Sequence, residues 1–205
     1  MPRNRRAASL VLAFSVRLPA LVAGSLALAV VLGLAVATAR SARAPTRAFT
    51  SPPCDGFDYP VGPPDAIGYY DAQPFGAAEH LGSDWNGNGG GDTDYGDPVH
   101  SIAGGRVVFA ADVGGGWGNV VRIVHRCEDG TVESVYAHLA SIAIEPGAEV
   151  RRGDPIGTIG DAGRQYLAHL HLEIRRVVGL PIGGGYGPDT GDHVDPTAFI
   201  DARRP

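Results

Sequence analysis

Two histidines and a glutamate alternate with apolar residues near the C-terminal end of the chain. His169, His171 and Glu173 are each separated by one leucine. Because side chains of a β-strand alternate between its two faces, this spacing predicts a strand over residues 169–175 with both imidazoles and the carboxylate on one face and the leucines toward the core. Imidazoles and carboxylates bind transition metals and transfer protons. The segment predicts a reactive face; the alternative is a solvated face that carries histidines without a task.

Two other polar groupings precede this strand. His80 and Asp84 are four residues apart, and Gly82 between them permits a tight bend, so both side chains could lie on one side of an extended chain or a helical turn. His138 stands at the end of a further β-rich run. Taken singly, each grouping is more often structural than functional. Their order along the chain is the stronger signal.

This order of motifs resembles the lysostaphin-like zinc metalloendopeptidases of bacterial cell walls. The resemblance covers roughly residues 76–200, and it extends to three further stretches, Gly96-Asp97-Pro98-Val99, Gly118-Asn119-Val120-Val121 and Asp195-Pro196. The resemblance implies hydrolysis of peptide bonds in peptidoglycan cross-links during cell-wall remodelling. It also implies a zinc ion (Zn2+) held by three metal ligands, His80, Asp84 and His171, beside a catalytic pair, His138 and His169.

The chemistry of these residue types is consistent with that assignment. Two neutral imidazoles and one carboxylate leave a fourth tetrahedral position for water, as in catalytic zinc sites. A general base is still needed, because the sequence has no His-Glu-x-x-His helix to supply a glutamate. His138 or His169 must therefore take the water proton or stabilise the developing oxyanion, and the division of these roles stays open. A serine nucleophile is disfavoured, since no Gly-x-Ser-x-Gly elbow is present.

Two other metal sites fit part of the pattern. Asp84 opens a stretch like the start of an EF-hand loop, with Asp92 at its ninth position, but Tyr95 stands where a bidentate glutamate is required. A two-histidine, one-carboxylate iron site uses the same ligand set, but such sites usually carry a His-x-Asp pair that is absent here. Zinc is therefore expected. The Asn86–Asp97 stretch is longer than the family usually has, and we expect it to reshape one wall of the groove.

The predicted fold class is mostly β. Short β-rich runs are punctuated by glycine, and Asp129-Gly130 between two of them predicts a hairpin. No amphipathic helix of convincing length is evident. The expected architecture is a single antiparallel β-sheet domain of the lysostaphin-like type over residues 76–205, with strands at 106–111, 119–125, 132–138, 155–159 and 169–175.

The N-terminal part of the chain predicts export. Residues 1–17 hold four arginines and no acid, and residues 18–39 carry no charge over a length that can span a bilayer. Ala37-Thr38-Ala39 resembles a signal-peptide cleavage site, so a transmembrane anchor and a cleaved signal peptide both remain open. Either places the rest of the chain in the extracytoplasmic cell envelope. Residues 40–75 contain seven prolines and predict a semi-rigid linker.

Cysteine count and charge agree with this location. Cys54 and Cys127 are the two cysteines, and an even count in an exported chain predicts one disulfide. The formal net charge is −5, and without residues 1–39 it is −9, which argues against a general nucleic-acid binder. The expected partners are peptidoglycan peptides and, through the N-terminal helix, the membrane. A regulatory protein partner is possible, but the sequence does not identify it.

A rival function has the same fold. A non-catalytic module could bind the cell wall or activate an amidase. Such members of the family typically lose metal ligands or catalytic histidines, whereas all five positions are filled here, which favours the enzyme. The three remaining histidines, His100, His125 and His193, are expected on the surface or behind the ligands rather than in catalysis.

Overall fold

A computed structural model describes residues 52–205. The predicted basic region, the predicted anchor or signal peptide, and the first part of the predicted linker lie outside the described residues. Within residues 52–205 no helix is both long enough and apolar enough to cross a membrane.

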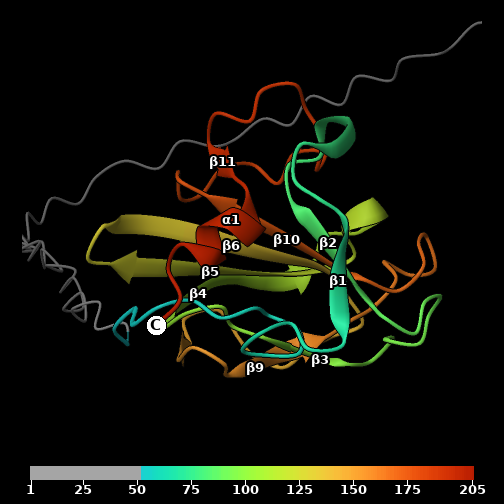
Figure 1. The fold of residues 1–205 in the computed structure, drawn as a ribbon, viewed down its shortest axis with the longest axis horizontal. Coiled ribbons are helices and arrows are strands. Elements are labelled where there is room, and N and C mark those ends of the chain that lie inside the picture. The colour runs from blue at the N-terminus through green and yellow to red at the C-terminus, as the bar shows by residue number, and fades with distance from the viewer. Residues whose placement is uncertain (1–51) are drawn as a thin grey trace, which may run out of the picture. The chain divides into compact units, whose positions relative to one another are not determined.

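Two antiparallel sheets form the domain (Figure 1). The eight-stranded sheet has, in spatial order, β1 (Tyr69–Gln73), β2 (Ser83–Gly87), β10 (Leu170–Arg175), β6 (Gly130–Leu139), β5 (Asn119–Cys127), β4 (Gly105–Asp112) and β8 (Glu149–Val150), with β11 (His193–Val194) paired to β10. The second sheet has the order β3 (Pro98–His100), β9 (Pro155–Thr158) and β7 (Ser141–Ile142). The mostly β, antiparallel fold class predicted from the sequence is confirmed.

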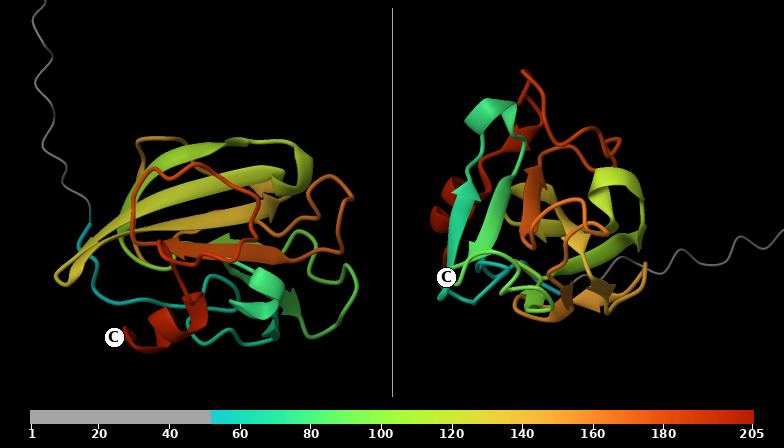
Figure 2. Two further views of the ribbon diagram at one scale, coloured as in Figure 1. Left: turned by 90° about the horizontal axis from the view of Figure 1, so that it is seen from above. Right: turned by 90° about the vertical axis from the view of Figure 1, so that its right-hand side faces the viewer.

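The hydrophobic core lies between these two sheets. Leu170, Leu172 and Ile174 point into it from β10, as the alternation predicts, and Val99 and Ile156 meet them from the second sheet. The loop that follows β10 crosses the opposite face of the long strands, as the view from above shows (Figure 2). The large sheet is therefore covered on both faces, and the functional residues of β10 lie on the face away from the core.

The five predicted strands are all present, each within two residues of its expected ends. The predicted hairpin between β5 and β6 is present, with Cys127 opposite Gly130, but its two turn residues are Glu128 and Asp129, one position earlier than Asp129 and Gly130. The short strands β1, β2, β3, β7, β8 and β11 were not predicted, because strands of two to five residues offer too few alternating positions. The one α-helix within residues 52–205 is α1 (Pro196–Asp201), which Asp195 caps by accepting a hydrogen bond from the Ala198 amide.

The described part of the predicted linker belongs to the folded domain. Phe57, Tyr59 and Val61 are buried in the main core, and β1 pairs with β2. The domain therefore begins well before residue 76, and the boundary placed there needs correction. Proline excludes regular ladder hydrogen bonding but not burial, so the proline-rich composition alone misplaced the boundary.

The predicted disulfide is confirmed. Cys54 is bonded to Cys127, across a sequence separation of 73 residues. The bond ties the start of the described chain to the tip of the β5–β6 hairpin. It lies at the opposite end of that hairpin from His138.

Candidate metal centre and active-site cleft

Two neighbouring strands place Asp84 and His171 opposite each other. β2 pairs with β10 in antiparallel register, and the Cα atoms of Asp84 and His171 are direct partners. The Asp84 Oδ1 atom lies 2.8 Å from Nδ1 of His171. Gly82 is needed here for space rather than for a bend, because a Cβ atom would come within 2.8 Å of the His171 ring and 2.5 Å of the Leu172 carbonyl oxygen.

His80 completes a triangle of donor atoms. Its Nε2 atom lies 3.1 Å from Nδ1 of His171 and 3.4 Å from Oδ1 of Asp84. Zinc bonds of 2.0–2.2 Å in a tetrahedron put neighbouring ligand atoms about 3.3–3.6 Å apart, so three sides of 2.8 to 3.4 Å approach the size of one tetrahedral face. Among residues 52–205 this trio is the one group of three or more His, Cys, Asp or Glu side chains close enough to share an ion.

The far side of each imidazole ring is held by an acceptor. Nδ1 of His80 donates to the Gln73 carbonyl oxygen at 3.0 Å, and Nε2 of His171 donates to Oε1 of Glu173 at 3.2 Å. A proton fixed on the outer nitrogen leaves the inner nitrogen as the lone-pair donor, an arrangement that metal-binding histidines usually show. The donor set therefore fits a zinc ion in its spacing, and the outer acceptors favour the tautomer that zinc requires once the inner proton has left His171.

Hydrogen bonds within the triangle stabilise the charged forms of Asp84 and His171. Burial raises the pKa of Asp84, but hydrogen bonds from His171 and His80 outweigh it and hold the pKa below its usual range. Burial lowers the pKa of His171, but its hydrogen bonds to Asp84 and Glu173 outweigh this and raise the pKa to about 9. A cation bound at the triangle would replace the proton that His171 shares with Asp84.

A β-bulge turns His138 into the site. In a regular strand His138 would share the core face of Tyr136, but β6 has one extra residue near its end, and His138 has a φ angle of 62°. Bulges commonly redirect a side chain in this way. The His138 ring centroid lies 4.7 Å from that of His169 and 5.4 Å from that of His171. Burial, and to a lesser degree the charges of His171 and His169, lower the pKa of His138 to about 3.

His169 lies at the entrance to β10. Its Nδ1 atom donates to the Leu167 carbonyl oxygen at 2.8 Å, and its Nε2 atom is 3.7 Å from Oδ2 of Asp84. The Asn86–Asp97 insertion holds the preceding residue, since Asp92 accepts a hydrogen bond from the Ala168 amide and Asn86 donates to the Ala168 carbonyl oxygen. Asp84 and Asp92 are thus directed to different partners rather than to one calcium site.

Of the five predicted site residues, Asp84, His138, His169 and His171 line a cleft of about 420 Å³, and His80 is fully buried. Seven wall residues are not among the site residues predicted from the sequence, namely Gln73, Gly116, Trp117, Tyr166, Gly184, Gly185 and Tyr186. Trp117 and Tyr186 both stand within glycine-rich runs, and an aromatic residue isolated in such a run was the available signal. Trp117 crosses toward the opposite wall, donating from Nε1 to the Gly183 carbonyl oxygen.

The remaining histidines lie outside the cleft lining. His125 is fully buried between the Gly104 carbonyl oxygen and Ser134 Oγ, so it lies neither on the surface nor behind the ligands, the two positions expected for it. Burial lowers its pKa to about 4. His100 is half-buried in β3, and His193 lies 3.5 Å from Oε2 of Glu173, behind His171. These positions agree with the expectation that His100, His125 and His193 take no part in catalysis.

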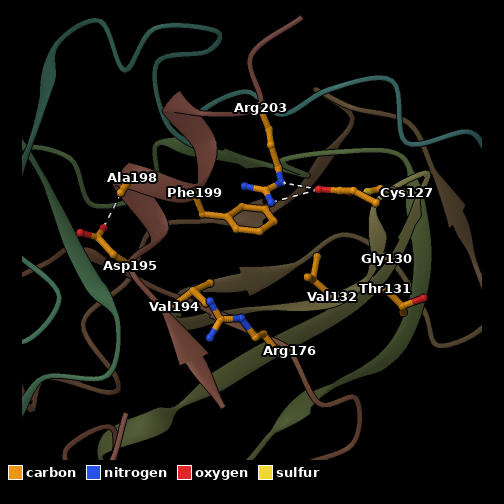
Figure 3. Close-up of a pocket in the computed structure, with 11 residues that line it drawn as sticks. Cys127, Gly130, Thr131, Val132, Arg176, Val194, Asp195, Ala198, Phe199 and Arg203 are labelled. Atoms are coloured by element: carbon orange, nitrogen blue, oxygen red, sulfur yellow. Dashed lines mark hydrogen bonds and ion pairs between the residues drawn. The ribbon is translucent and has the colours of Figure 1, made fainter. Parts of the chain in front are cut away.

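A second cavity of about 500 Å³ lies at the other end of the molecule, beside α1 and the β5–β6 hairpin (Figure 3). Arg203 is stacked 3.9 Å above the ring centroid of Phe199 and is paired with Asp129. Arg176 also points toward this cavity (Figure 3). Its lining residues include none of the trio His80, Asp84 and His171.

Comparisons with known proteins agree with this geometry. A stretch of 87 residues is 40% identical to the DD-carboxypeptidase/endopeptidase Mpg of Neisseria meningitidis serogroup B, covering 42% of this chain and 19% of Mpg. A stretch of 81 residues is 40% identical to the murein hydrolase activator EnvC of Escherichia coli, covering 40% of this chain and 18% of EnvC. The chain thus spans less than a fifth of the length of these relatives.

The fold is also found in a solved structure. A peptidase M23 from Pseudomonas aeruginosa aligns with a TM-score of 0.51 and 26% identity, over 71% of this chain and 50% of that chain. Lysostaphin from Staphylococcus simulans aligns with a TM-score of 0.48 and 26% identity, over 65% of this chain and 48% of that chain. The model of peptidase family M23 matches residues 79–196, which include His80, Asp84, His138, His169 and His171. The resemblance drawn from the three histidine motifs is therefore confirmed, and the chain belongs to peptidase family M23.

Proposed function

We propose that this chain is a zinc endopeptidase that hydrolyses peptide bonds in peptidoglycan. The observation that carries the proposal is the triangle of donor atoms from His80, Asp84 and His171, with two further histidines beside it in one cleft. When bound there, zinc would supply Lewis-acid activation of water and of the scissile carbonyl group. The three ligands would hold it, and His138 and His169 would remain for the proton transfers.

The hydrogen bonds of the two remaining histidines support a division of roles. The Leu167 carbonyl oxygen fixes the proton of His169 on Nδ1, so its Nε2 atom can accept a proton from the attacking water. His138 stays neutral because its pKa is lowered, and it can donate a hydrogen bond to the carbonyl oxygen as negative charge develops there. His169 is thus proposed as the general base and His138 as the oxyanion stabiliser.

The cleft lining supports cleavage of internal bonds. A free C-terminal carboxylate is usually bound by an arginine or lysine. The described residues that line the cleft include neither, and Asp84 is their one acidic side chain. Aromatic walls and glycine backbone suit a neutral, extended peptide segment that passes through the cleft.

The proposed location is the extracytoplasmic side of the membrane. The Cys54–Cys127 disulfide supports an oxidising compartment. Residues 18–39 would act as a single anchor or as a cleaved signal, preceded by the basic segment 1–17, and residues 40–51 would lead to the domain. Peptidoglycan peptides on that side of the membrane are the proposed substrate.

The rival is an activator of other hydrolases, which the similarity to EnvC favours. The deciding experiment incubates the full-length protein and zinc with purified peptidoglycan and identifies the released fragments by mass spectrometry. New amine termini that appear with the wild type, and are lost with His171→Ala, are expected for a peptidase. If the wild type releases none but accelerates a purified amidase on the same substrate, the chain is an activator and the proposal fails.

A further inference from the structure

A buried ionic layer lies on the sheet face that carries the site. Arg175 and Glu173 on β10 are 1% and 0% exposed, and their side chains form an ion pair with an Nη2–Oε2 distance of 2.5 Å. A second pair, Arg122 and Glu133, joins β5 to β6 on the same face. Burying an ion pair costs desolvation free energy, and hydrophobic residues of similar size at the same positions often give the folded protein equal or greater stability. Stability alone is therefore a weak reason for these pairs.

Arg175 also binds the loop that closes the site. Its guanidinium donates to the carbonyl oxygens of Leu180, Pro181 and Ile182 at 2.9 to 3.4 Å, in addition to Glu173. One planar fork thus fixes three consecutive peptide groups, which a lysine ammonium could not reach together. We name residues 179–187 the closing loop.

The closing loop continues directly to the metal ligands. The Gly185 carbonyl oxygen accepts from the Leu81 amide at 2.9 Å, and the Gly187 amide donates to the Glu79 carbonyl oxygen at 2.9 Å, so both bonds flank His80. The Tyr186 ring lies against the His80 ring with a centroid distance of 5.0 Å. The closing loop therefore holds His80 through its backbone bonds and the Tyr186 ring, and Arg175 holds the closing loop.

Glu173 links this arrangement to the second histidine. Its Oε2 atom accepts from Arg175, and its Oε1 atom accepts from Nε2 of His171. Arg175 thus reaches His171 through one carboxylate and His80 through the closing loop. The pair Arg122–Glu133 binds the same loop, at Leu180 and Gly179, but has no contact with either histidine.

We propose that Arg175 and Glu173 are positioning residues that set zinc affinity by holding His171 and His80 in one geometry. This inference rests on the proposed zinc site. Groups behind metal ligands typically change metal affinity by 10- to 100-fold when they are removed. The Arg122–Glu133 pair, which holds the loop without touching a ligand, is the matched control within the same chain.

The test measures the zinc dissociation constant of the full-length protein by competition with a chromogenic chelator. Arg175→Lys keeps the charge but loses the fork, and its dissociation constant should rise about 10- to 100-fold. Arg122→Lys also breaks a buried pair that holds the closing loop, so the melting temperature of the zinc-free protein, measured with a chelator present, should fall. Its zinc dissociation constant should nevertheless stay within about 3-fold of that of the wild type.

A second variant covers the case in which Arg175→Lys does not fold. Replacing both Arg175 and Glu173 by glutamine leaves no uncompensated buried charge, and the zinc dissociation constant should again rise about 10- to 100-fold. The inference is overturned if the variants at these two positions bind zinc as wild type does. It is also overturned if Arg122→Lys weakens zinc as strongly as Arg175→Lys. If the wild type itself binds no zinc, the proposed function fails first, and this result is distinct from both.

Discussion

Five side chains carry the proposed chemistry, and the structure separates them into two groups. His80, Asp84 and His171 turn their donor atoms toward one point at mutual distances of 2.8 to 3.4 Å. His138 and His169 lie beside this triangle, with their ring centroids 4.7 Å apart. A fourth protein ligand would close the coordination position that water needs in a catalytic site. The two groups should therefore respond differently to substitution.

Alanine substitutions should separate metal binding from catalysis. His171→Ala should lose zinc and activity together, because it removes a ligand. His138→Ala and His169→Ala should keep zinc but lower the hydrolysis rate by about 10²- to 10⁴-fold, as loss of a general base or an oxyanion donor does. Zinc content and hydrolysis rate are measured on variants first shown to be folded by circular dichroism. Release of zinc by His169→Ala but not by His171→Ala would reverse the assignment.

The raised pKa of His171 predicts a pH-dependent zinc affinity. A ring with a pKa of about 9 is protonated at pH 7, and zinc must displace that proton from Nδ1. Affinity should therefore fall as pH falls below 9, with the dissociation constant rising up to tenfold per pH unit. Competition titrations at pH 6.5, 7.5 and 8.5 measure this slope. His138→Ala should show the same slope, and a flat profile for the wild type would contradict the displaced proton.

At the scale of elements, the site depends on pairings between strands far apart in sequence. β2 and β10 bring Asp84 opposite His171, and the bulge in β6 brings His138 to the same face. The insertion between β2 and β3 holds Ala168, next to His169. The same β5–β6 hairpin that carries His138 at one end carries Cys127 at the other. Stability and site geometry can therefore be perturbed separately.

Removal of the disulfide should lower stability and leave the metal centre intact. Closing a loop of 73 residues contributes about 4 kcal/mol in the chain-entropy model, so a variant with Cys54 and Cys127 both replaced by serine should lose about 2–5 kcal/mol in its free energy of unfolding. Urea unfolding of both proteins measures the difference. The zinc dissociation constant serves as the control and should stay unchanged. An equal urea midpoint of unfolding for the wild type and the double serine variant would show that the disulfide does not constrain the unfolded chain.

At the scale of the whole molecule, the described domain includes Cys54, which packs against the core and is bonded to Cys127 at the tip of the β5–β6 hairpin. The segment between residue 39 and the domain is therefore shorter than the proline pattern alone indicates. A tether of this length would keep the cleft near the surface from which it emerges. The location of the chain in the envelope then depends on whether residues 18–39 are retained.

Membrane fractionation tests the proposed anchor. The full-length chain should sediment with membranes and resist extraction by high salt, because an apolar helix of this length partitions into the bilayer. A variant that replaces residues 18–39 with a cleavable signal should appear in the soluble extracytoplasmic fraction at the same level of hydrolytic activity. Recovery of the wild type as a soluble protein whose first residue follows Ala39 would instead establish signal cleavage.

The sequence by itself determined the features that are local in the chain. The two-residue period of β10, the Asp129-Gly130 signal and the three histidine motifs are short-range patterns, and the strands and the family follow from them. The disulfide follows from the presence of two cysteines in a chain with an export signal. The paired Cys54 was also a signal that the proline-rich segment is attached to the domain. Proline content describes a preference of the backbone and not burial, so it does not mark where the domain begins.

Only the tertiary structure decided how distant residues meet. Alternation places His138 on the core side of β6, and one extra residue in the strand reverses that direction. Glu173 shares the predicted reactive face with the two histidines, but its burial together with Arg175 and the contact of Arg175 with the closing loop cannot be read from the spacing. Bulges and loop packing depend on contacts between segments separated by many residues. Local periodicity carries no information on such contacts, so the positioning of the metal ligands could be read only from the folded chain.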